Sequence, residues 1–139
     1  RVDKALYLSD KPEVLDRLLV CHNFDDEAKN CGGCEKCYRT ALCFIVHGKN
    51  VPRSIRIDWR ACEKNKIYLE TLRDDPEVSR EVFLKTVQEN LTHPELVRFR
   101  RRYRIYLTTE AIKEIFLVWG LRKGISKAPG APSAMSGTG

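Results

Sequence analysis

Apolar residues recur at three- and four-residue spacing along most of the chain, which is the period of an amphipathic helix. The clearest case begins at Glu35 and stops before Gly48, a residue suited to the position after a helix C-terminus. Its apolar face consists of Tyr38, Ala41, Leu42, Ile45 and Val46. We therefore predict a helix over this segment, with one buried face.

A shorter helix is predicted ahead of it, from Asp10 into Cys21. Asp10 and Glu13 have the spacing of a capping box, and Pro12 sits where a first-turn proline is tolerated. Val14, Leu15, Leu18 and Leu19 follow at helical spacing. The polar segment after Cys21 then breaks the pattern, so the two predicted helices are joined by a loop.

Further helices are predicted in the second half of the chain. Residues 49–60 read as an extended or irregular connection, followed by a helix over residues 61–73. Asp75 and Pro76 mark the next helix start. The buried stripe expected from that start is Val78, Val82, Phe83, Val87 and Leu91.

Two more helices complete the prediction. Thr92 and Glu95 have capping-box spacing and open a helix through about Leu107. Thr108 or Thr109 then caps a last helix, which carries Ile112, Ile115, Phe116 and Trp119 and stops near 120–124. The fold class is therefore mostly α, as one small helical domain over residues 1–125. The Gly-, Ser-, Pro- and Ala-rich segment 126–139 is predicted to be a disordered tail.

Composition narrows the classes of protein that this chain can represent. Hydrophobic residues make up 42% of the 139 residues and charged residues 32%, as in globular domains. No apolar run approaches the roughly 18 residues that cross a bilayer, so we expect no membrane partner. The chain opens with RVDKAL and shows no signal segment. We expect a cytoplasmic protein, of which this chain is a fragment.

Five of the six cysteines lie within residues 21–43, and four of them have metal-ligand spacing. Cys31, Cys34 and Cys37 are separated by two residues each, which lets one turn aim three thiolates at one centre, and Cys21 supplies a fourth corner. Gly32 and Gly33 remove side-chain obstacles from that turn. The pattern predicts a closed, structural four-cysteine zinc knuckle between the first two predicted helices. Cys43 and Cys62 are predicted to be buried core residues.

Two other interpretations of the cysteines stay open. An iron–sulfur cluster also uses cysteines separated by two residues, although the ferredoxin run continues to a cysteine followed by proline, which Cys43 does not match. Disulfides, or a redox switch between Cys31 and Cys34, would need an oxidising or thioredoxin-like context. Zinc is the interpretation we favour.

Cys21 followed by NCGGCEKC at residues 30–37 resembles the cysteine-rich C-terminal segment of the 7-cyano-7-deazaguanine synthase family, a branch of the PP-loop ATP pyrophosphatases. In that family a lone cysteine precedes the pattern C-G-x-C-x-x-C, and the four thiolates hold zinc. The resemblance covers residues 9–48 and implies that the zinc ligands are Cys21, Cys31, Cys34 and Cys37. The resemblance implies that this chain is the C-terminal part of a divergent relative of that family.

The resemblance also implies a partner and a second cofactor. Enzymes of this family use ATP on an N-terminal catalytic domain that carries an S-G-G-x-D-S phosphate loop, and this sequence contains no such loop. The expected partner is therefore a catalytic domain of the same protein, with ATP bound there. The catalytic residues stay unknown, and this chain alone is not expected to be catalytic.

The arginine-rich stretch RFRRRYR at residues 98–104 supports a different hypothesis. The formal net charge of +6 and the pI of about 9.1 permit a polyanionic partner. The candidate polyanion-binding residues are Arg98, Arg100, Arg101, Arg102 and Arg104, interleaved with aromatic residues. On a helix, however, Leu96, Phe99, Tyr103 and Tyr106 share one face, so we favour a core face with solvated arginines. The alternative is a zinc-binding interaction module whose arginine helix contacts nucleic acid or an acidic protein.

Overall fold

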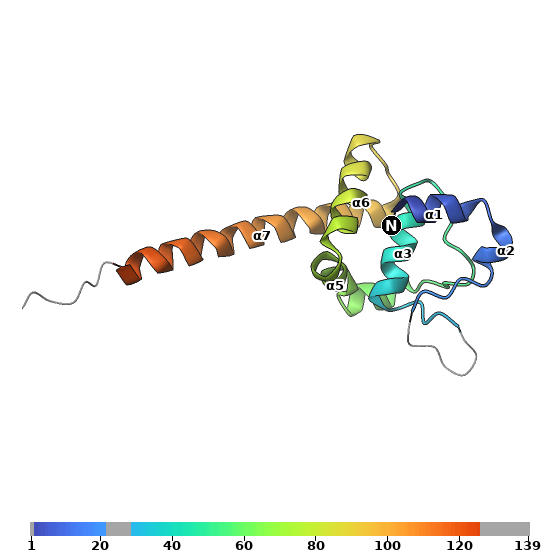
Figure 1. Ribbon diagram of the computed structural model, residues 1–139, viewed down its shortest axis with the longest axis horizontal. Helices are drawn as coiled ribbons and strands as arrows, with labels where there is room; N and C mark the ends of the chain where they lie inside the picture. The colour runs from blue at the N-terminus through green and yellow to red at the C-terminus, as the bar shows by residue number, and fades with distance from the viewer. Residues whose placement is uncertain (1, 22–28, 126–139) are drawn as a thin grey trace, which may run out of the picture. The chain divides into compact units, whose positions relative to one another are not determined.

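The computed structural model of this chain describes residues 2–21 and 29–125, and within α7 it describes side chains as far as residue 117. In these ranges there are seven helices and no strand, which confirms the mostly α fold class (Figure 1). The predicted tail at 126–139 lies outside the described residues. The helices are α1 Val2–Ser9, α2 Pro12–Leu15, α3 Glu35–Ile45, α4 Trp59–Lys64, α5 Ile67–Asp74, α6 Pro76–Gln88 and α7 Pro94–Ile125.

The chain forms two compact units, Arg1–Tyr106 and Leu107–Gly139. The first unit contains α1 to α6 and the first part of α7, and the second contains the remainder of α7. In the second unit, the described apolar side chains are exposed, among them Leu107, Ile112, Ile115, Phe116 and Leu117. None of the described helices combines the length and apolarity that a membrane span requires.

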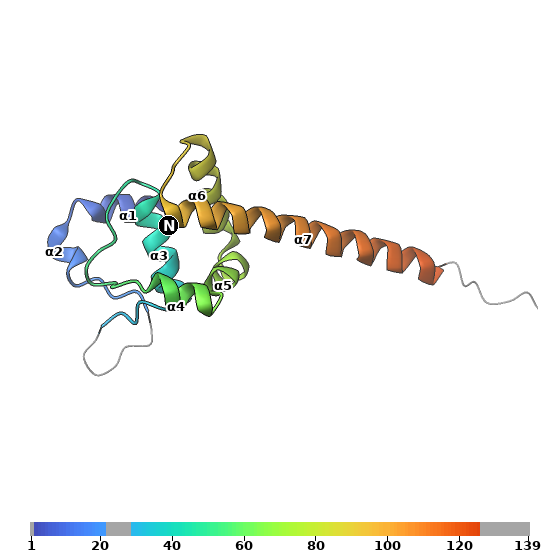
Figure 2. The ribbon, with the colours of Figure 1, turned by 180° about the vertical axis from the view of Figure 1, so that it is seen from behind.

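Helix α3 lies at the centre of the first unit, packed against α1 and α5 (Figures 1 and 2). Its face from Tyr38 to Ile45 is buried, as the apolar spacing predicts. The same core takes buried side chains from α1, α4, α5, α6 and α7, including Val2, Cys62, Leu72, Val82 and Phe99, and the partly buried Leu15 of α2 packs against it. Gly48 follows with φ +67°, the left-handed conformation expected after a helix end.

The predicted start of α6 is confirmed, with one change to its buried face. The Asp75 carboxylate accepts a hydrogen bond from the backbone N–H of Val78 at 3.3 Å, and Pro76 begins the helix. Val78 and Val82 are buried, and Phe83 packs against the core. Val87 is 40% exposed, so its assignment to the buried stripe was wrong. At helical spacing Val87 lies near the edge of that stripe, and the buried residue of the last turn is Thr86.

The helix predicted from Asp10 to Cys21 is much shorter in the structure. It spans only Pro12–Leu15, and its N-cap is Lys11 without a side-chain hydrogen bond. Side chains from other segments donate hydrogen bonds to carbonyl groups that a longer helix would have paired with its own backbone N–H groups. Ser54 Oγ donates to the Leu15 oxygen at 2.6 Å, and Asn30 Nδ2 donates to the Leu18 oxygen at 2.6 Å.

The helix predicted over residues 61–73 is two helices. Lys66 adopts φ +54°, a left-handed conformation that interrupts the hydrogen-bond ladder between α4 and α5. The periodic pattern does not reveal this break, because neither glycine nor proline marks it. Helix α1 was not predicted at all, so the cysteine segment lies between the second and third helices.

The two helices predicted on either side of Thr108 form one helix, α7. No proline or glycine occurs between Pro94 and Gly120, and a helix tolerates threonine at a cost below about 1 kcal/mol. The capping box predicted from Thr92 is also absent. Instead, His93 Nδ1 accepts a hydrogen bond from the backbone N–H of Glu95 at 3.3 Å.

The burial of α3 generates a stability prediction. Leu42 is 1% exposed, so Leu42→Ala should lower the free energy of unfolding by about 2–5 kcal/mol through lost burial and a new cavity. Leu69→Ala removes the same atoms from a side chain that is 43% exposed. It should change the free energy of unfolding by no more than about 0.5 kcal/mol. Urea unfolding followed by circular dichroism measures both. Equal losses would contradict the placement of α3 at the core.

Candidate metal centre

The structure brings four of the six cysteines together. The Sγ atoms of Cys21, Cys31, Cys34 and Cys37 all lie within 4.8 Å of one another. Cys21 belongs to the segment after α2, Cys34 is the N-cap of α3, and Cys37 lies in its first turn. Cys21 and Cys37 are buried, whereas Cys31 is exposed. Residues at these four positions are the set that the sequence spacing selects.

Gly32 sets the shape of the loop between the first two cysteines of the knuckle. Its φ is +70°, and a Cβ atom added there would lie 2.4 Å from the carbonyl oxygen of Arg56. The Gly32 carbonyl accepts a hydrogen bond from the Asp58 N–H at 2.9 Å and from the Cys62 thiol at 3.8 Å. The loop therefore packs directly on the segment that precedes α4.

Asn30 connects the chain segments around the cysteines through hydrogen bonds. This residue was not identified from the sequence. Its Oδ1 accepts hydrogen bonds from the backbone N–H groups of Val20 and Cys21, at 2.8 and 3.4 Å. Its Nδ2 donates to the carbonyl oxygens of Leu18 and Ser54, at 2.6 and 2.9 Å. Because Asn30 is only 7% exposed, these four bonds satisfy a buried amide. The sequence carries no periodic signal for such a role.

Ile55 forms the apolar floor of the centre. It is 0% exposed and clusters with Cys21 and Cys37. Residues 49–60, expected only to be an irregular connection, therefore supply one wall of the cysteine centre. An apolar wall excludes water from the buried sulfur atoms of Cys21 and Cys37 and strengthens electrostatic interactions with them.

The protonation of the thiols reflects these surroundings. Burial raises the pKa of Cys34 and of Cys37 above that of a free thiol. Burial also acts to raise the pKa of Cys31, but hydrogen bonds with the Gly33 backbone and with the thiols of Cys34 and Cys21 outweigh it and lower that pKa. A bound cation would offset the burial cost by stabilising the thiolate forms.

The donor set fits a tetrahedral metal ion. Metal–sulfur bonds of about 2.3 Å place the sulfur atoms of a regular tetrahedron about 3.8 Å apart. The observed limit of 4.8 Å is within about 1 Å of that edge, so side-chain rotations suffice to close the site. Four thiolates would complete the coordination, which leaves no position for water or substrate.

The remaining two cysteines lie in the core. Cys43 is 5% exposed and Cys62 is 1% exposed, as predicted for small buried residues. Burial raises the pKa of each thiol to about 11, so both are neutral near pH 7. Neither completes a second ligand group among the described residues.

The arginine stretch lies on α7 with its aromatic residues turned inward. Phe99 and Tyr103 are buried and Tyr106 packs against the same core, as the helical spacing predicts. Three of the five candidate arginines, Arg98, Arg101 and Arg102, line a groove. Arg100 and Arg104, named with them from the sequence, are outside that lining.

No protein-family model, curated protein or solved structure matches this chain.

Gly32 provides a direct test of the loop geometry. Gly32→Ala combines a strained left-handed φ with a contact to a backbone oxygen, and we expect it to destabilise the protein and weaken metal binding. Gly48 has nearly the same φ, +67°, but no atom within 4 Å of an added Cβ. Gly48→Ala should therefore cost only about 1–2 kcal/mol, without affecting the metal. Urea unfolding and a metal-competition titration compare the two; equal effects would contradict the packing described here.

Proposed function

We propose that the four cysteines bind one zinc ion as a closed structural site. The observation that carries this proposal is the convergence of four thiols within 4.8 Å on a glycine-shaped loop. Zinc prefers four thiolates in tetrahedral arrangement and has no redox chemistry of its own, so such an ion would serve folding.

The ion would join two parts of the chain that the core holds only weakly to a third part that lies in the core. The segment at Cys21 follows a four-residue helix with no buried residue, and Cys31 is in a loop. Cys37, by contrast, belongs to the central helix. Zinc would tie the first two to the third, and the free energy of binding would become free energy of folding.

We further propose that this helical domain belongs to a PP-loop-type, ATP-dependent enzyme related to the 7-cyano-7-deazaguanine synthases. The support is the order and spacing of the motif, a lone cysteine followed by C-G-G-C-E-K-C, together with a site that has no open coordination position. ATP and the catalytic groups would then belong to a separate N-terminal domain. This domain would act as a zinc-stabilised body beside it.

Elemental analysis of the purified chain tests the metal. We expect about one zinc per chain, and we expect Cys34→Ser to lose it because three thiolates and a hydroxyl bind zinc much more weakly. Cys43→Ala is the matched control, because Cys43 is buried outside the ligand group and should leave the zinc content unchanged. Iron with acid-labile sulfide, or no metal in protein purified without chelators, would contradict a structural zinc site.

The coding sequence upstream of Arg1 tests the enzyme assignment independently of the metal. We expect a strand followed by an S-G-G-x-D-S loop in the same reading frame, since that loop binds the phosphates of ATP. A protein that begins near Arg1, or one whose upstream region lacks this loop, would contradict the assignment even if zinc is found. The interaction-module hypothesis would then be favoured.

A further inference from the structure

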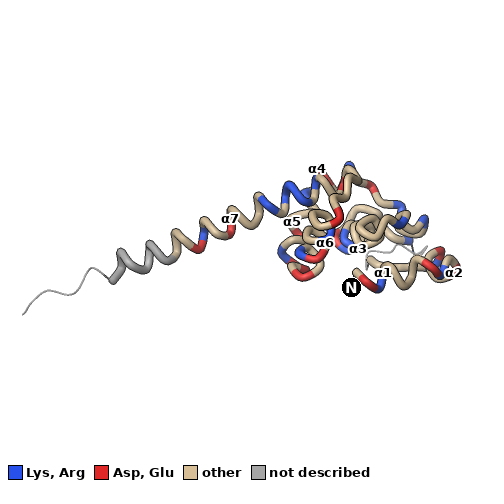
Figure 3. The backbone as a smooth tube through the Cα atoms, turned by 90° about the horizontal axis from the view of Figure 1, so that it is seen from above, with Lys and Arg blue, Asp and Glu red and all other residues tan. Residues whose placement is uncertain are grey.

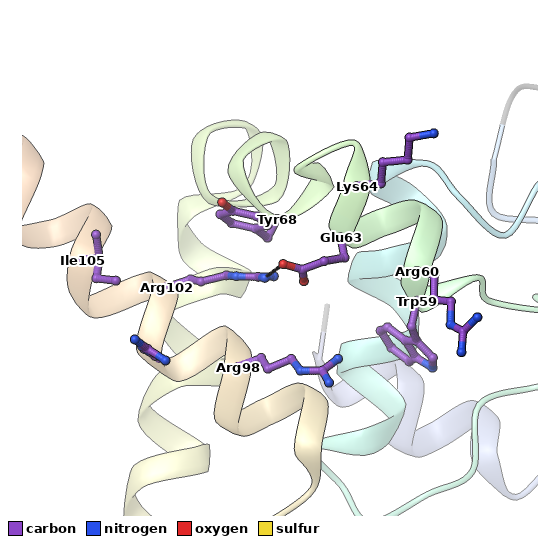
Figure 4. A pocket seen from close by; sticks show the side chains of 9 residues that line it. Trp59, Arg60, Glu63, Lys64, Tyr68, Arg98, Arg102 and Ile105 are labelled. Carbon is purple, nitrogen blue, oxygen red and sulfur yellow. Dashed lines mark hydrogen bonds and ion pairs between the residues drawn. The ribbon is translucent and has the colours of Figure 1, made fainter.

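A groove of about 800 Å³ lies between α4, the start of α5 and the first part of α7, within the first compact unit. Its volume is within the roughly 300–1,000 Å³ range of ligand pockets in proteins. Figure 4 shows side chains from both walls meeting across it. The lining residues are Trp59, Arg60, Glu63, Lys64, Tyr68, Arg98, Arg101, Arg102 and Ile105.

Positive charge dominates this groove. Five of the lining side chains are cationic and one, Glu63, is a carboxylate. In the described part of the chain, no carboxylate lies within ion-pair distance of Arg60, Lys64 or Arg101, all three of which are exposed. Basic residues are likewise concentrated on the stretch of α7 beside α4 (Figure 3). Unpaired cations around a concave site favour an anionic ligand.

Arg102 has a different role, because it builds the wall. Its guanidinium lies 3.9 Å from the centre of the Tyr68 ring and pairs with Glu63, which connects α7 to α4 and α5. The Arg102 side chain is only 18% exposed. Arg102 is therefore a positioning residue, and it neutralises Glu63, the carboxylate among the lining residues. Arg98 is 56% exposed and pairs with Glu95 on its own helix at 2.7 Å.

Trp59 adds an aromatic surface to the positive wall. Its indole packs edge-on against the Tyr38 ring, with 5.8 Å between ring centres and an angle of 76° between the planes. That contact fixes the orientation of a side chain that is still partly exposed to the groove. In Figure 4 the guanidinium of Arg98 extends from α7 toward this indole.

We propose that this groove binds single-stranded nucleic acid. Arg60, Lys64 and Arg101 would contact phosphates, and Trp59 would stack on a base. An indole beside cations is the combination that single-strand binding sites use. A duplex keeps its bases stacked on one another and would offer nothing to Trp59, whereas an inorganic anion would need only the cations. The proposal does not depend on the identity of the metal or on the enzyme assignment.

Fluorescence anisotropy of the full 139-residue chain with a labelled oligouridine of about 12 nucleotides tests the groove. We expect R60A/R101A to weaken binding at least tenfold. Loss of two phosphate contacts should also reduce the slope of log affinity against log salt by about 1.4. R73A/R80A removes two exposed arginines outside the groove and matches the change in net charge. Its affinity should stay close to that of the parent chain.

Trp59 gives a second readout that electrostatics alone would not produce. In a W119F background Trp59 is the sole tryptophan, and its fluorescence should be quenched on binding. W59F should retain most of the affinity, and W59L should lose about tenfold or more. Thermal melts establish that each variant is folded. The proposal would be overturned if the groove and control variants lost affinity equally, or if binding did not quench Trp59. It would also be overturned if a duplex bound with equal affinity, or if an acidic peptide or a mononucleotide displaced the oligouridine at similar concentration.

Discussion

One helix connects the cysteine centre to the hydrophobic core, and the rest of the first unit depends on that connection. Cys37 and Tyr38 are adjacent in the first turns of α3, at 0% and 2% exposure. The first faces the other cysteines, and the second faces the core. The position of α3 is thus constrained from two sides. Any ion held by the cysteines acts directly on the element around which α1, α5 and the other helices are packed.

A second connection ties α3 to α6 through charge. Arg39 donates to the Asp75 carboxylate at 2.8 Å, and Asp75 is also the N-cap of α6. Glu35 lies 3.1 Å from the same guanidinium. Burial raises the pKa of Glu35, and Arg39 opposes that rise while Asp74 and Asp75 add to it. One arginine therefore compensates two partly buried carboxylates at the junction of the helices.

The sequence predicts the parts of this molecule that rest on local rules. Helix α3, the Asp75 cap and the grouping of the four cysteines follow from periodicity, capping chemistry and spacing. Some of the errors occur where distant segments decide the outcome, and others where a local break carries no sequence mark. Asn30 and Ser54 take the carbonyl groups after α2. Lys66 interrupts a periodic pattern without glycine or proline, and Asn30 is buried by contacts that a sequence does not reveal.

The groove could not be predicted from the sequence either, because its walls come from segments about forty residues apart. The Arg102–Glu63 pair shows this separation. The arginines of α7 were visible in the sequence, but Trp59, Arg60 and Lys64 on α4 were not associated with them. Three hydrogen bonds place α4. The Asp58 side chain caps the helix by accepting from the Ala61 N–H at 2.9 Å. The Asp58 N–H and the Cys62 thiol both donate to the Gly32 carbonyl.

Helix α4 therefore has one end anchored on the cysteine loop and one face directed at the groove. Gly32 lies between two of the four clustered cysteines, so the geometry of that cluster is passed to α4 through a single backbone carbonyl. Trp59 and Arg60 belong to the first turn of the helix that the hydrogen bonds to this carbonyl hold. Contacts that order the groove wall in the free protein reduce the conformational entropy that is lost when a ligand binds there.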